Sequence, residues 1–81
     1  MTIEVEVQEI EEYTNQKGDK YHRVIMLEKK GIRQFLQWSV KDEYKRDIQN
    51  LKEGSSALVK VKKIASNYDG SLNLTCELVK S

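Results

Sequence analysis

The chain has 81 residues, a third of them charged, and a net charge of only +1 at pH 7. This length suits one small domain covering residues 1–81, with a modest core. A charge so near zero excludes nonspecific clamping of duplex DNA by overall positive charge. Cys76 is the only cysteine, which excludes an internal disulfide and a cysteine-cluster zinc site.

The start of the sequence shows no sign of export. Its first twelve residues carry five glutamates, no basic residue and no apolar segment of the signal-peptide type. No apolar run in the chain is long enough to span a bilayer. We therefore expect a cytoplasmic protein that makes no membrane contact, with Cys76 as a buried, unreactive thiol between Leu74 and Leu78.

The first predicted strand begins near the start of the chain. Residues 2–7 alternate between apolar and polar side chains, which indicates a strand with one buried side. The alternation then slips, because Ile10 falls out of step with Val7. We expect a β-bulge near residues 8–9, which would restore the phase and bend the strand.

A polar loop and a second strand follow. Gly18 and Asp19 lie in a polar cluster between two strand-like segments, which is typical of a hairpin. The second strand is predicted over residues 21–28. Residues 24–27 are all apolar, so alternation leaves open which side of this strand faces the core.

The third strand is predicted over residues 32–40, after a tight turn. Its inward side is expected to carry Ile32, Leu36, Trp38 and Val40. Phe35 then points outward, which is informative because a large exposed aromatic ring is unusual. Trp38 is interpreted as a core residue, with a place on the binding surface as the alternative.

Residues 41–52 change to a helical period. Apolar side chains recur at spacings of four, four and three, at Val40, Tyr44, Ile48 and Leu51. We expect one amphipathic helix of about three turns, with Tyr44 in the core. Gly54 follows at the place of a left-handed C-terminal cap.

Two further strands complete the prediction. Residues 57–61 and 72–78 alternate, and the turn cluster of residues 66–71 between them contains an Asp-Gly pair, a strong hairpin signal. The first and fourth strands are neighbours in the barrel proposed below, so cross-strand ion pairs are expected between them. These would join Lys60 and Lys62 to Glu4 and Glu6.

The predicted order is strand, strand, strand, helix, strand, strand, which is typical of a small five-stranded barrel. Three segments resemble the oligonucleotide/oligosaccharide-binding (OB) fold in its nucleic-acid-binding branch. They are the bent strand, Lys/Gly loop and second strand of residues 7–31, the helix after the third strand, and the helix end with its Val-x-Val strand in residues 51–64. The fold class expected is all-β with one helix, an OB-type barrel.

The resemblance implies a binding face on the second and third strands, flanked by the loops after the first and fourth strands. Phosphate contacts and base stacking are expected from Lys17, Lys20, Tyr21, Arg23, Arg33, Phe35 and Tyr68. The implied ligand is single-stranded DNA, with RNA as an alternative, held by stacking and charge with little sequence preference. The other function class left open is a protein-binding adaptor or inhibitor without nucleic-acid affinity, which the acidic first strand suits.

Nothing in the sequence predicts an enzyme, a cofactor or a metal site. The chain contains one histidine, His22, and no phosphate-binding or nucleophile motif. We interpret His22 as a surface or strand-edge imidazole. A binding domain this small offers few contacts, so self-association or a protein partner is expected where high affinity matters.

Overall fold

The computed structural model describes residues 1–66, 68, 70 and 72–79. Within them the chain forms five strands and one short 3-10 helix. The elements are β1 Thr2–Thr14, β2 Lys20–Glu28, β3 Phe35–Lys41, η1 Asp42–Asp47, β4 Ser56–Ser66 and β5 Leu72–Leu78. This order confirms the prediction of a mostly β chain with one helix after the third strand.

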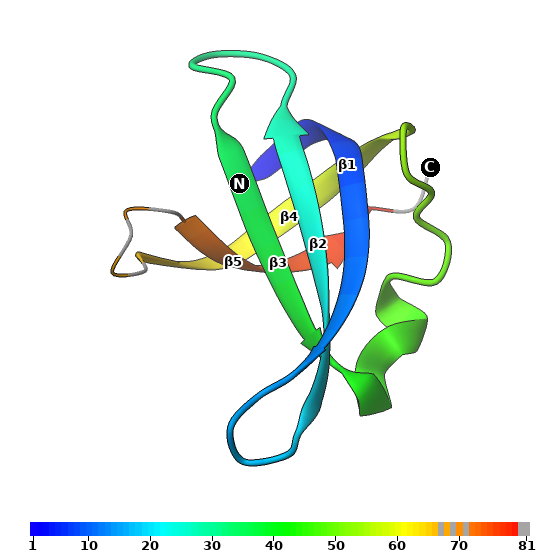
Figure 1. The fold of residues 1–81 in the computed structure, drawn as a ribbon. Coiled ribbons are helices and arrows are strands. Elements are labelled where there is room, and N and C mark those ends of the chain that lie inside the picture. Colours follow the sequence, from blue (N-terminus) through cyan, green and yellow to red (C-terminus); the bar gives the residue numbers. More distant parts are fainter. Residues whose placement is uncertain (67, 69, 71, 80–81) are drawn as a thin grey trace.

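The strands close into a barrel (Figure 1). Around the barrel they follow the order β1-β2-β3-β5-β4, and β4 pairs with β1 to complete it. The neighbouring pairs are antiparallel, except that β3 and β5 run parallel. A closed mixed barrel with a short helix between β3 and β4 is consistent with an OB-like fold.

β1 pairs with β4 near its start and with β2 along most of its length. Its register against β2 shifts between Val7 and Glu9, which confirms the predicted bulge. Beyond the bulge, the Glu53 carboxylate accepts a hydrogen bond from the Ile10 amide at 2.9 Å. The bend therefore needs no glycine in the strand, because a side chain from the loop before β4 satisfies the freed backbone group.

The core lies inside the barrel and draws on every strand. Its buried apolar side chains are Val5, Val7, Val24, Met26, Leu36, Trp38, Val40, Ile48, Leu51, Val59 and Leu74. Trp38 is only 3% exposed, which confirms its interpretation as a core residue. In β2 the buried residues are His22, Val24 and Met26, so the structure settles the orientation that alternation left open.

The expectation that Ile32 belongs to the core is wrong, because its side chain is 85% exposed. β3 begins only at Phe35, and the residues before it form a loop closed by the Glu28 amide donating to the Gln34 carbonyl at 3.1 Å. Arg33 adopts a φ of 58° in this loop, and its amide donates to the Glu28 carboxylate at 3.2 Å. The strand alternation therefore stops before it reaches Ile32. Phe35 does point outward, as predicted.

The predicted three-turn helix is also wrong in length. η1 has six residues, and Tyr44 has non-helical angles and is 55% exposed instead of buried. The backbone hydrogen bonds in this segment join residues three apart, which is the 3-10 and not the α-helical pattern. The Ile48 amide donates to the Lys45 carbonyl, and the Leu51 amide donates to the Ile48 carbonyl. With this tighter winding Ile48 and Leu51 face the core, whereas Tyr44, four residues before Ile48, does not. No helix in the described ranges is long and apolar enough to cross a membrane.

β1 and β4 are neighbours as predicted, but the expected ion pairs between them are wrong. The register sets Glu4 opposite Leu58 and Glu6 opposite Ser56, so neither faces a lysine across this pair of strands. Lys62 pairs instead with Glu77 of β5, at 2.8 Å. The sequence could identify the neighbouring strands, but their register depends on the length of the loops between them.

Candidate nucleic-acid interface

The outward side chains of β2 and β3 form one continuous surface, which we call the outer β2–β3 face. Alternation places four residues of each strand there, and the antiparallel register sets them in opposite pairs. The pairs are Tyr21 with Lys41, Arg23 with Ser39, Ile25 with Gln37, and Leu27 with Phe35. Of the seven predicted contact residues, this face carries Tyr21, Arg23 and Phe35.

Two tyrosines and an arginine pack together at the loop end of this face. Tyr13 of β1 lies opposite Tyr21, and their rings stack with centroids 5.4 Å apart and planes at 15°. The Arg23 guanidinium carbon lies 4.3 Å from the Tyr13 ring centroid. Such aromatic and cation–π contacts contribute about 0.5–1.5 kcal/mol each. We call these three half-buried residues the ring–guanidinium stack.

Arg23 is held from two directions. Its Nη1 donates a hydrogen bond to the Glu11 carboxylate at 3.0 Å while its plane covers the Tyr13 ring. Its Nε atom is buried and has no hydrogen-bond partner in the described part of the chain. The charge of Arg23 is thus partly balanced by Glu11, and its guanidinium is held within the ring–guanidinium stack.

Tyr13 was missing from the predicted contact residues. The signal was present in the sequence, because Tyr13 and Tyr21 lie at equal distances from the middle of the Asn15–Asp19 loop and therefore pair across the hairpin. Tyr13 then points to the same side of the sheet as Tyr21, because directly paired residues share a side.

Phe35 and Arg33 lie at the other end of the face. Phe35 is 63% exposed and lies opposite Leu27. Leu27 lies six positions beyond Tyr21 in β2, which corresponds to about 20 Å along the strand. The ring–guanidinium stack and the Phe35 ring therefore mark two ends of one surface.

Lys20 and Lys17 are placed differently from each other. Lys20 shares the side of β2 that carries His22, opposite to that of Tyr21, and lies 3.5 Å from the Glu12 carboxylate. Lys17 is exposed in the β1–β2 loop, where the Asn15 side-chain oxygen accepts hydrogen bonds from the amides of Lys17 and Asp19. Lys17 is exposed in the loop at one end of the outer β2–β3 face, whereas Lys20 lies on the opposite side of β2.

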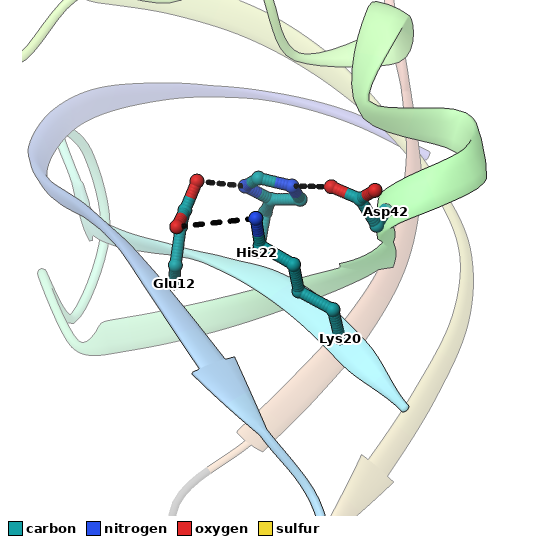
Figure 2. A network of polar contacts seen from close by, with 4 residues as sticks. All are labelled: Glu12, Lys20, His22 and Asp42. Carbon is teal, nitrogen blue, oxygen red and sulfur yellow. Dashed lines mark hydrogen bonds and ion pairs between the residues drawn. The ribbon is translucent and has the colours of Figure 1, made fainter. Parts of the chain in front are cut away.

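The interpretation of His22 as a surface imidazole is wrong. The residue is only 8% exposed, and its Nε2 lies 2.7 Å from the Asp42 carboxylate, with Nδ1 3.9 Å from Glu12 (Figure 2). The hydrogen bond from His22 holds the pKa of Asp42 below its ordinary value. His22 therefore connects the β1–β2 hairpin to the first residue of η1, across 20 residues of sequence.

Tyr68 lies in the β4–β5 connection and is fully exposed. The neighbouring residues of the predicted Asp-Gly turn, Asn67, Asp69 and Ser71, lie outside the described residues. Tyr68 is therefore available for stacking by its exposure.

Cys76 lies in β5 among side chains that pack against the core, and it is half-buried. Burial raises the pKa of its thiol to about 11. We expect iodoacetamide to alkylate Cys76 at pH 8 roughly a hundredfold more slowly than in the same chain unfolded in guanidinium, because the thiolate is the reactive form. Mass spectrometry of timed samples measures both rates, and equal rates would contradict the expected protection.

No protein-family model matches the chain, and a search of curated proteins finds no match to its sequence. Among the described residues, no group of three or more histidine, cysteine, aspartate or glutamate side chains is arranged to hold a metal ion. The outer β2–β3 face presents aromatic rings, polar side chains and a few cations on one side of the barrel.

Proposed function

We propose that the outer β2–β3 face binds single-stranded nucleic acid, DNA in the first place and RNA as an alternative. The observation that supports this most is the combination of the ring–guanidinium stack with the exposed Phe35 ring on one face. Stacking on aromatic rings holds bases of every kind and contributes about 1–3 kcal/mol per base. Rings about 20 Å apart along the strands suit several consecutive bases of an extended single strand.

Cations near the two ends of the face would contact the phosphates. Lys17 projects from the β1–β2 loop, Lys41 lies opposite Tyr21, and Arg33 lies beside the Phe35 end. These three are exposed, and none of them has an ion-pair partner among the described residues. The low net charge of the chain is compatible with this, because the charge needs only to be sorted along one path.

The binding test is a titration of labelled oligo(dT) and oligo(rU) followed by fluorescence anisotropy at low and moderate salt. For three phosphate contacts, the logarithm of the association constant should fall with the logarithm of salt concentration with a slope of about −2. Lys17→Ala should weaken binding at low salt and reduce the slope by about 0.7. Lys20→Ala is the matched control, because that lysine is paired with Glu12 on the other side of β2.

Two results would count against the proposal. Absence of binding to either oligonucleotide at low salt would overturn it. Equal losses in Lys17→Ala and Lys20→Ala would show that the hairpin as a whole, and not the outer β2–β3 face, makes the contact.

A groove favours the second candidate function, a protein-binding adaptor. It has a volume of about 600 Å³ and is lined by Leu58, Leu78 and Val79 with Glu4 among its polar residues. Leu58 and Val79 are exposed there. None of these residues belongs to the outer β2–β3 face, so protein binding at this groove would survive the substitutions that test nucleic-acid binding.

A further inference from the structure

Two side-chain amides lie next to each other where the outer β2–β3 face meets β5. Gln37 of β3 is the register partner of Asn73 of β5, where these two parallel strands meet. Ile25 flanks Gln37 on β2, and Ala65 flanks Asn73 on β4. The four residues form one row that crosses the sheet, and both amides are half-buried.

This row lies between the two groups of rings. Arg23 is two residues from Ile25 in one direction and Leu27, the partner of Phe35, is two residues away in the other. Each step of two residues is about 7 Å along a strand. A single strand whose bases stack at both ends of the face therefore passes over Gln37, with Asn73 beside it on β5.

The two polar atoms of the Asn73 side chain differ in burial. Its Oδ1 atom is buried and has no hydrogen-bond partner among the described residues. The exposed part of this half-buried side chain therefore lies on the side of its Nδ2 amino group, which is a hydrogen-bond donor. The Gln37 side chain makes no hydrogen bond with another described residue and can support the same contact.

We propose that Asn73, supported by Gln37, gives the face a preference for thymine or uracil over cytosine at one nucleotide position. Thymine presents a carbonyl acceptor at its 4-position, whereas cytosine presents an amino donor there. An outward amide donor pairs with the first and opposes the second. The rings and cations of the face do not make this distinction, because stacking and phosphate contacts tolerate every base. The inference rests on the proposed function.

The experiment compares labelled oligo(dT) and oligo(dC) of equal length with the full chain under identical salt conditions. The wild-type protein should bind oligo(dT) at least about fivefold more tightly than oligo(dC). Asn73→Ala should bring the ratio close to one, and Asn73→Asp, which replaces the donor by an acceptor of the same shape, should reverse it. Tyr44→Ala, on η1 and away from the outer β2–β3 face, should leave the ratio unchanged.

The ratio of the two affinities separates selectivity from overall affinity, so general weakening in a variant does not confuse the result. Equal binding of both oligonucleotides by the wild-type protein would overturn this inference and leave the proposed function intact. An unchanged ratio in both Asn73→Ala and Asn73→Asp would also overturn it. Absence of binding to either oligonucleotide would overturn the proposed function itself.

Discussion

Replacing Phe35 with alanine is expected to weaken oligo(dT) binding by about 1–3 kcal/mol, roughly five- to 150-fold in the dissociation constant. The reason is that its ring, 63% exposed, is a large stacking surface at one end of the outer β2–β3 face. An exposed ring contributes little to the core, so the free energy of unfolding should change by less than about 0.5 kcal/mol. Anisotropy titration measures the first quantity and thermal unfolding the second.

Tyr44 provides a matched control for this substitution. It is an aromatic residue of similar exposure, 55%, but it lies on η1 and not on the outer β2–β3 face. Tyr44→Ala should therefore leave oligo(dT) binding unchanged. If it weakens binding as much as Phe35→Ala does, or if Phe35→Ala has no effect, the assignment of the face is wrong.

The second large effect concerns stability. His22→Ala is expected to lower the free energy of unfolding by about 2–3 kcal/mol, because it removes a ring that is only 8% exposed together with its part-buried hydrogen bond to Asp42. For a domain of this size that corresponds to a loss of roughly 10 °C or more in Tm. Urea unfolding followed by circular dichroism measures the change. Glu12→Gln is the control and should cost little, since Glu12 is exposed and its oxygen lies 3.9 Å from the ring.

The same contact predicts a dependence on pH that Asp42→Asn should remove. Since the hydrogen bond from His22 lowers the pKa of Asp42 from its ordinary 3.8, ionised Asp42 favours the folded state. This contribution is present above about pH 4 and is lost as the pH falls through the lower, folded pKa. The Tm difference between wild type and Asp42→Asn should thus be constant at mildly acidic pH and shrink toward pH 2.

For the His22→Ala substitution itself, a decrease of less than about 0.5 kcal/mol in the free energy of unfolding would contradict the structural role of the His22–Asp42 contact.

The sequence predicted the inward-facing residues correctly in strands that bury only one of their two sides. Alternation in β1, β3 and β5 predicted the inward residues, and the slip at Ile10 predicted the bulge, because a period of two is a direct consequence of strand geometry. The helix was mispredicted for a related reason. Ile48 and Leu51 are three residues apart, a spacing that fits both an α-helix and the tighter winding that the chain adopts, so only Tyr44 could distinguish them.

The positions of the predicted contact residues on the barrel followed from the sequence in part. Tyr21, Arg23 and Phe35 share a face as expected, whereas Lys20 lies on the other side, a placement that follows from alternation once the orientation of β2 is known. The partner of His22 could not be predicted, since Asp42 is distant in sequence and meets it only when η1 packs against the barrel end. The apposition of Gln37 and Asn73 likewise depends on a parallel pairing between strands that local patterns do not reveal.

That parallel pairing has a consequence for the stability of the bound state. In the described part of the chain β3 and β5 are joined through three residue pairs, from Leu36 with Leu72 to Trp38 with Leu74, the fewest of any neighbouring strands in the barrel. A short seam between strands that are distant in sequence is where a closed sheet opens at the lowest free-energy cost. The two amide residues, Gln37 on β3 and Asn73 on β5, lie on opposite sides of this seam. A ligand that lies across it contacts both sides and binds only the closed barrel, so binding and closure of the sheet are thermodynamically coupled.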